Sequence, residues 1–83
     1  MDTEQTLRIV LADVLNLGDR ADALTSASPL LGALPELDSM AVAALIAAIE
    51  DHFAVTFEDD DLTEATFATL GSLASVVAAR RGG

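Results

Sequence analysis

A serine hydroxyl beside an aspartate, Asp38-Ser39 in the stretch LPELDSMAVAALIAAIEDHF, is the pair of side chains in this 83-residue chain best placed to do chemistry. Both residue types are good helix N-caps, so the simplest interpretation is that they cap the helix that follows. A residue in the first helical turn also lies beside unpaired backbone N–H groups, and these donors and the helix dipole favour a phosphate ester there. Ser39 is therefore the candidate for a covalently attached phosphodiester, and the residues alone do not name it.

A hydrolytic triad is the first alternative for this serine, because the chain also contains aspartates and one histidine, His52. Ser39 and His52 lie on the same predicted helix, and thirteen residues at 1.5 Å per residue separate them by roughly 20 Å. The histidine cannot then act as the base for the serine. We predict no catalytic residue and no enzymatic activity.

Two other stretches resemble functional motifs. The run EDDDLTE at 58–64 is acidic, but it lacks the alternate ligand spacing, the glycine and the final glutamate of a calcium loop, so we predict no metal site. We interpret it as the solvated start of a short helix that also contributes to partner binding.

The ending ARRGG is similar to the tails of ubiquitin-like and sulfur-carrier proteins, which project from β-rich folds. With no strand pattern here, we predict a frayed helix end.

Helical periodicity runs through most of the chain. A first helix is expected in TEQTLRIVLADVLNLG and ends at Asn16 and Gly18, with Gly18 as its left-handed cap. A second runs from Asp38 to Phe53, and a last one begins near Thr69 and stops at Gly82 and Gly83, with Arg80 and Arg81 in its final turn. Their inner faces are Leu7, Val10, Leu11 and Val14; Val42, Leu45, Ile46, Ile49 and Phe53; and Leu70, Leu73, Val76 and Val77.

The two long connections complete the predicted fold. The stretch 55–68 has room for one short helix that begins at its acidic run. The stretch 17–37 is unusually long for a compact domain, and its leucines predict that it lies packed across the bundle. These leucines are Leu24, Leu30, Leu31, Leu34 and Leu37. We predict a single all-α domain over residues 1–83, a small bundle of three main helices and a short third helix, with a long packed loop after the first.

Composition narrows the partners. The chain has fourteen acidic residues but only four arginines and no lysine, which gives a formal net charge of -10. Such a surface repels nucleic acid and favours partners with basic patches. The chain has no cysteine, its start is acidic where a secretory signal would be basic, and its longest apolar run, 40–49, is about half a membrane span. A soluble, monomeric, cytoplasmic protein is expected.

Taken together, these residues resemble the phosphopantetheine-bearing acyl carrier proteins. The resemblance covers nearly the whole chain: Asp38-Ser39-Met40 at the end of the long loop, ALIAAIEDHF after it, the acidic short helix, and TLGSLASVV in the last helix. It implies that a transferase using Mg²⁺ attaches 4'-phosphopantetheine from coenzyme A to Ser39, beside the motif acid Asp38. The thiol of that arm would then carry a cargo as a thioester.

The resemblance also implies where partners and cargo lie. Partners would include the phosphopantetheinyl transferase, a ligase that loads an acyl or aminoacyl group, and a downstream acyltransferase or synthase with a basic surface. The expected partner contacts are Glu36, Met40, Glu50, Asp51, Asp59 and Asp60. An acyl cargo would be sheltered by Leu45, Ile46, Ile49, Phe57 and Leu62.

Some residues depart from the usual pattern. Pro35-Glu36-Leu37 precedes the motif where the family usually has a glycine, and Met40 replaces the usual leucine. LDSM is more similar to the D-alanyl and other aminoacyl carriers, and the alanine-rich second helix indicates a specialised set of partners. We predict an acyl carrier protein. Two alternatives stay open, an aminoacyl carrier and a carrier-like helical adaptor that is not modified, and an enzyme ranks after both because no base lies within reach of the serine.

Overall fold

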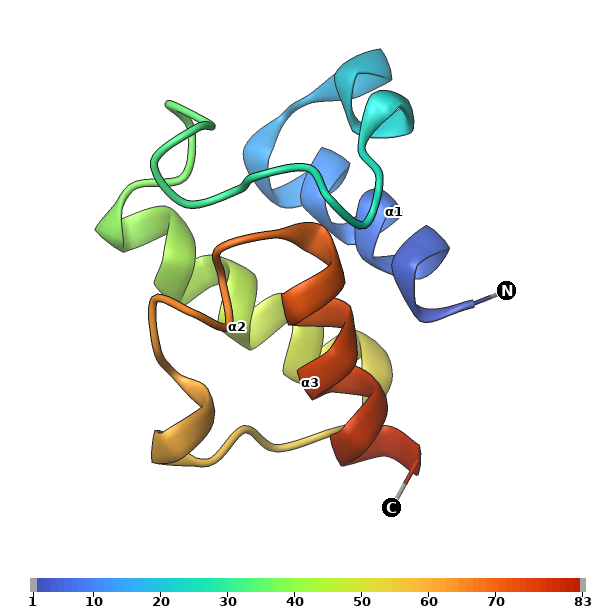
Figure 1. Cartoon of the computed structure of the whole chain (residues 1–83), viewed down its shortest axis with the longest axis vertical. Coiled ribbons are helices and arrows are strands. Elements are labelled where there is room, and N and C mark those ends of the chain that lie inside the picture. The colour runs from blue at the N-terminus through green and yellow to red at the C-terminus, as the bar shows by residue number, and fades with distance from the viewer. Residues whose placement is uncertain (1, 83) are drawn as a thin grey trace.

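Three α-helices build the molecule, which we describe from a computed structural model over residues 2–82 (Figure 1). They are α1 (Thr3–Leu15), α2 (Ser39–Phe53) and α3 (Leu70–Gly82), and two 3-10 helices, η1 (Gly18–Ala23) and η2 (Asp59–Asp61), lie in the connections. No strand is present in the described part, where one isolated bridge joins Pro29 to Thr69. The predicted all-α bundle is confirmed. The predicted stop of the last helix at Gly83 lies outside the described residues.

Local capping explains where α1 and α2 begin. Asp2 accepts a hydrogen bond from the Gln5 N–H at 2.7 Å, and Asp38 accepts one from the Ala41 N–H at 2.8 Å. Each aspartate therefore satisfies one of the backbone donors that a helix start leaves unpaired. The expected capping role of Asp38 is observed.

The end of α1 differs from the prediction. Asn16, rather than Gly18, takes the left-handed cap, with φ of 58° and its N–H bonded to the carbonyl of Ala12. Asparagine tolerates this conformation because its short polar side chain can hydrogen-bond locally. Gly18 also has a positive φ, of 59°, but it starts η1, which the sequence did not indicate.

Apolar side chains from the three α-helices and from both connections form one core. Its largest fully buried side chains are Leu7, Leu11, Leu30, Leu45, Ile49, Leu70, Leu73 and Val77. The predicted inner faces supply most of them, because a period of 3.6 residues places such positions on one side of a helix. No helix of the described chain is both long enough and apolar enough to cross a membrane.

The long connection between α1 and α2 packs on the core, as predicted. Leu30 is fully buried and Leu37 is 5% exposed, while Leu24, Leu31 and Leu34 are partly buried against the same cluster. In Figure 1 this connection crosses the bundle above α2 and α3. It thereby ends in a defined position immediately before Asp38.

The expected third helix is a single 3-10 turn, Asp59–Asp61, followed by turns up to Phe67. The Thr63 hydroxyl accepts the Thr66 N–H at 3.2 Å, and the two threonine hydroxyls lie 3.2 Å apart. Such local side-chain bonds compete with helical ones, which accounts for the absence of a longer helix here. The acidic run does lie at this turn, as predicted.

Candidate functional site

Ser39 occupies the first helical position of α2, and its side chain is exposed. None of the hydrogen bonds found among residues 2–82 involves its hydroxyl, because Asp38 performs the capping. At this position the backbone N–H groups of Ser39 and Met40 lack intrahelical acceptors. An exposed hydroxyl beside free donors at the positive end of a helix fits a phosphodiester well.

The two residues before the Asp38-Ser39 pair are held in place by burial and by an ion pair. Leu37 is buried and donates its N–H to the Leu34 carbonyl at 3.0 Å. Beside it, Arg20 of η1 forms a two-pronged ion pair with Glu36, with nitrogen–oxygen distances of 2.5 and 3.1 Å. The Arg20 hydrogen bonds hold the pKa of Glu36 below its usual value. The serine is therefore presented from a fixed turn.

The six expected partner contacts fall into two groups. Met40 is 83% exposed, and Asp51, Asp59 and Asp60 are also exposed. The other two acids make bonds within the molecule: Glu36 pairs with Arg20, and Glu50 accepts the N–H of Phe57 at 2.8 Å. The first group is free to meet another protein, whereas the second positions the chain.

A mainly apolar groove of about 190 Å³ lies between α2 and the segment before α3. Two of the five expected cargo residues, Ile46 and Leu62, line it. The other three are core residues: Leu45 and Ile49 are fully buried, and Phe57 is 8% exposed. The remaining lining residues are Leu31, Val42, Thr63, Glu64 and Phe67.

The helical periodicity of the sequence predicts only some of the residues that line the groove. Val42 precedes Ile46 by four positions on the apolar stripe of α2, so it shares that face. Leu31 and Phe67 come from connections without a regular period, and they meet because the Leu31 N–H donates to the Phe67 carbonyl at 3.0 Å. That pairing depends on the tertiary fold.

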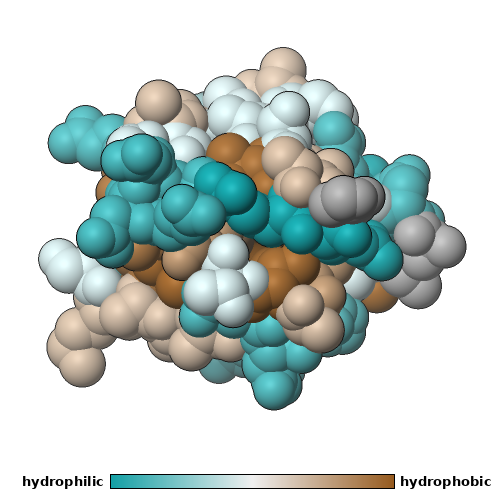
Figure 2. All heavy atoms as spheres, turned by 90° about the horizontal axis from the view of Figure 1, so that it is seen from below, coloured by the Kyte–Doolittle hydropathy of each residue, from teal (hydrophilic) through white to brown (hydrophobic). Residues whose placement is uncertain are grey.

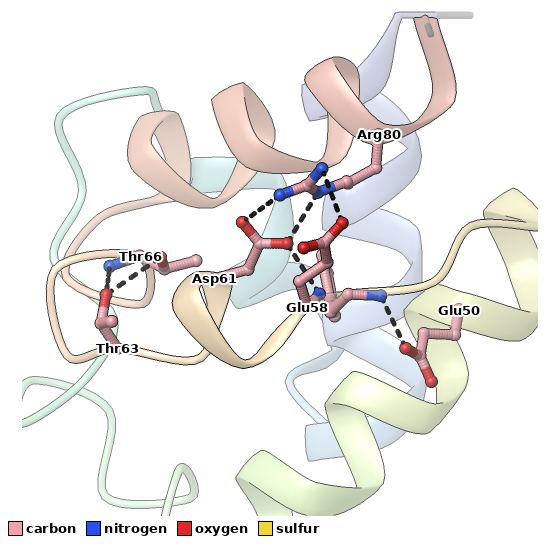
Figure 3. A network of polar contacts seen from close by, with 7 residues as sticks. Glu50, Glu58, Asp61, Thr63, Thr66 and Arg80 are labelled. Atoms are coloured by element: carbon pink, nitrogen blue, oxygen red, sulfur yellow. Dashed lines mark hydrogen bonds and ion pairs between the residues drawn. The ribbon is translucent and has the colours of Figure 1, made fainter.

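A polar network supports the segment behind the groove (Figure 3). Arg80 of α3 donates to both carboxylate oxygens of Asp61, at 2.7 and 2.9 Å, and lies 3.6 Å from Glu58. The hydrogen bonds from Arg80, and then that from the Glu58 N–H, hold the pKa of Asp61 below its usual value. On the face shown in Figure 2, which is seen from the lower side of Figure 1, hydrophilic side chains form a band across apolar ones.

The structure also places the residues of the alternative chemistries. His52 is exposed in the last turn of α2, whereas Ser39 begins that helix, so the two do not meet. Within residues 2–82, no three histidine or acidic side chains are grouped to hold a metal ion. The histidine therefore does not neighbour the serine.

The sequence matches the phosphopantetheine attachment site family, PP-binding, over residues 5–77. It is also similar to a holo acyl carrier protein from Nitrosomonas europaea, known from a solution NMR structure. The two chains are 51% identical over 93% of each, with a TM-score of 0.87. No curated protein matches the sequence.

A second similarity is to a carrier protein from Agrobacterium tumefaciens in crystal structures with an engineered Bradyrhizobium japonicum glycine:[carrier protein] ligase. In the complex with ATP the identity is 28% over 90% of this chain and 95% of that one, with a TM-score of 0.77. In the complex with AMP the TM-score is 0.75, again at 28% identity, over 89% and 96% of the two chains.

The chain therefore belongs to the phosphopantetheine attachment site family, and its fold is that of the acyl carrier proteins. It is a carrier protein and not an enzyme, and its cofactor is covalently attached 4'-phosphopantetheine.

Proposed function

We propose that residues 1–83 form one discrete carrier domain that carries an acyl group as a thioester on a 4'-phosphopantetheine arm attached to Ser39. The observation that supports this attachment point is the exposed Ser39 hydroxyl, which is free of internal hydrogen bonds while Asp38 caps the helix. Modification can then occur without disturbing the start of α2.

Each part of the site has a separate task in this proposal. Asp38 orders the first turn, and the N–H groups of that turn are available to the phosphodiester. The bound arm supplies a thiol on which the acyl group is held. Ile46 and Leu62 exclude water from an apolar cargo in the groove. At about 190 Å³ the groove is smaller than common small-molecule pockets, so a short acyl group suits it.

The proposed partners are a phosphopantetheinyl transferase, a loading ligase, and a downstream acyltransferase or synthase with a basic surface. Met40 stands exposed next to Ser39, Asp51 is exposed near the other end of α2, and Asp59 and Asp60 are exposed in η2. Ala43, Ala44 and Ala47 leave the solvent face of α2 short of charge, which supports a specialised biosynthetic pathway. We also propose that the protein is cytoplasmic. We expect it to be a monomer, because a formal charge of -10 opposes self-association.

The test of the attachment is the intact mass of the protein after incubation with coenzyme A, Mg²⁺ and a broad-specificity phosphopantetheinyl transferase. The expected result is a gain of one phosphopantetheinyl group in the natural chain and none in Ser39→Ala. Ser75→Ala, which changes another exposed serine on a helix, is a matched control and should still be modified. No gain in folded protein with several transferases would favour the unmodified helical adaptor instead.

An aminoacyl cargo is the second candidate, supported by the likeness to a carrier solved with a glycine:[carrier protein] ligase. The two cargoes are separated by loading the phosphopantetheinylated protein. We expect it to accept short acyl groups from an acyl-activating ligase. Acceptance of an amino acid from an adenylating ligase, with refusal of every acyl group, would replace the acyl proposal by the aminoacyl one.

Partner recognition can be tested at Asp51, which is exposed and makes no ion pair among the described residues. Asp51→Lys should weaken transferase or ligase binding several-fold at low salt and less at high salt, because salt screens exposed charges. Asp22→Lys, which makes the same charge change on η1, is the control. An equal loss in both variants would show that only net charge matters.

A further inference from the structure

We propose that Arg80 is a specificity-determining positioning residue: through Asp61 it holds one wall of the groove in place and so limits the length of acyl chain that the protein can shelter. This inference rests on the proposed function, because it concerns the acyl cargo of that site. The groove wall is defined here as residues 62–66, of which Leu62, Thr63 and Glu64 line the groove.

The groove wall is exposed between two anchored ends. Leu62 is 43% exposed although it is a large apolar residue, and Thr63, Glu64 and Ala65 are exposed as well. The hydrogen bonds between Thr63 and Thr66 stay within the wall, so few contacts hold its exposed middle to the rest of the molecule. This is the usual property of a segment that opens locally at low cost. Its position must be set mainly by what fixes its ends.

The end towards α3 is fixed by burial and by backbone bonds. Thr66 is 7% exposed and its carbonyl accepts the Ser72 hydroxyl at 2.8 Å. Phe67 is 4% exposed, and its carbonyl accepts the Leu31 N–H at 3.0 Å. These contacts are shielded from solvent, so this end does not depend on charge.

The other end is fixed by charge. Asp61 precedes the wall directly and is bound by both prongs of the Arg80 guanidinium, an arrangement that defines orientation as well as distance (Figure 3). The Glu58 N–H also donates to Asp61, at 2.9 Å, and this bond folds the η2 turn without Arg80. Loss of Arg80 should therefore leave η2 formed but release it from α3.

A longer acyl chain needs more room than about 190 Å³, and α2 cannot readily supply it because Val42 and Ile46, its two groove residues, are packed against the core. Leu31 and Phe67 are held together by the hydrogen bond between their backbones, so they do not readily part. Outward movement of Leu62 is the remaining way to enlarge the groove, and Asp61, its neighbour, opposes that movement while it is paired with Arg80. Short chains fit the held wall, whereas long chains have to displace it.

The experiment compares Arg80→Ala with Arg81→Ala. Arg81 is the next residue and its removal changes the charge equally, but it lies over the Phe53 ring, 5.1 Å from the centroid, and not on the wall. Each protein is loaded by the transferase with the acyl-phosphopantetheine of butyryl- or decanoyl-coenzyme A. The hydrolysis rate of each thioester is then followed by intact mass at low salt.

We expect a crossed result. Relative to Arg81→Ala, Arg80→Ala should hydrolyse the decanoyl thioester more slowly and the butyryl thioester faster, each by up to about fivefold, the range set by an exposed ion pair. Arg80→Lys should lie between the two, because lysine keeps the charge but loses the two-pronged geometry. Equal rates in Arg80→Ala and Arg81→Ala, or faster hydrolysis of both chain lengths, would overturn the inference.

Hydrogen exchange of the unmodified proteins tests the restraint without any cargo. Amides of residues 62–66 should exchange faster in Arg80→Ala than in Arg81→Ala, while those of α1 remain unchanged. Unchanged exchange in the wall would contradict the restraint even if loading succeeds. Failure to load Ser39 in every variant, with the wall amides faster in Arg80→Ala, would overturn the proposed function and leave the restraint supported.

Discussion

Two long connections in this protein are held in place by different physical means. The loop before α2 buries Leu17, Leu30 and Leu37 in the core. The segment before α3 buries Phe57 and Phe67 towards its two ends but leaves residues 62–65 in solvent, and Arg80 of α3 holds Asp61, the residue just before them. Burial resists salt and pH, whereas exposed charge pairs respond to both. The well-packed connection leads into the serine, and the segment before α3 supplies four of the seven residues that line the proposed cargo groove.

The two connections meet at one place. The Leu30 N–H donates to the Ala68 carbonyl at 2.9 Å, and the Gly71 N–H donates to the Ser26 carbonyl at 2.8 Å. These bonds run beside the isolated bridge of Pro29 and Thr69. The well-packed loop thus anchors the far end of the looser segment.

The largest loss of stability should come from a substitution in the loop before α2, the connection that is held by burial. Leu30→Ala removes a fully buried side chain and should lower the free energy of unfolding by about 2–5 kcal/mol. Leu62→Ala, in the other connection, should cost roughly 1 kcal/mol because that side chain is 43% exposed. Urea denaturation of both variants checks the difference, and similar losses would show that the two connections are equally packed.

The next largest loss of stability should come from the first turn of α3, where Gly71 lies against the loop before α2. A Cβ at Gly71 would lie 2.8 Å from the Ser26 carbonyl oxygen, too close for an ordinary contact. Overpacking of this kind costs about 1–3 kcal/mol, against a gain of up to about 1 kcal/mol from the better helix propensity of alanine. We therefore expect Gly71→Ala to lower the thermal midpoint. Ser75→Ala, exposed on the same helix, is the control, and a more stable Gly71→Ala would show that the approach is relaxed.

The smallest change in stability should come from the exposed Arg80–Asp61 pair. Its dependence on pH follows from the direction of the pKa shift of Asp61. The pKa of Asp61 is depressed in the folded protein by Arg80, so the pair stabilises the fold above the ordinary carboxyl pKa of about 4. That contribution is lost as pH falls through the lower folded value. Arg80→Ala should therefore lose less stability than Arg81→Ala between neutral and strongly acid pH.

Denaturation of the two variants in low salt checks this pH dependence. The Arg20–Glu36 pair shifts the pKa of Glu36 in the same direction and contributes equally to both proteins, so it cancels in the comparison. High salt should reduce the difference, since it screens the exposed pair. Identical acid transitions in the two variants would mean that Asp61 does not tether the segment.

Local patterns predicted the parts of this protein that depend on neighbours in sequence. The stripes of α1, α2 and α3, the cap at Asp38 and the burial of the loop leucines could be predicted because period, capping and apolar content are local properties. The sequence predicts the left-handed cap of α1 at Gly18, but the structure has it two residues earlier, at Asn16, because asparagine can also adopt that conformation. The third helix was reduced to one turn by the bonds of Thr63 and Thr66.

The sequence alone determined a small acidic helical bundle with an exposed serine at a helix start, because each of these follows from residue type and spacing. Only the tertiary structure decided which carboxylates remain free for partners and which are paired, and which apolar side chains line the groove. Arg20 lies sixteen residues from Glu36 and Arg80 nineteen from Asp61, and Leu31 lies far from Phe67 in sequence. No local pattern reports such contacts, since packing of the whole chain brings these residues together.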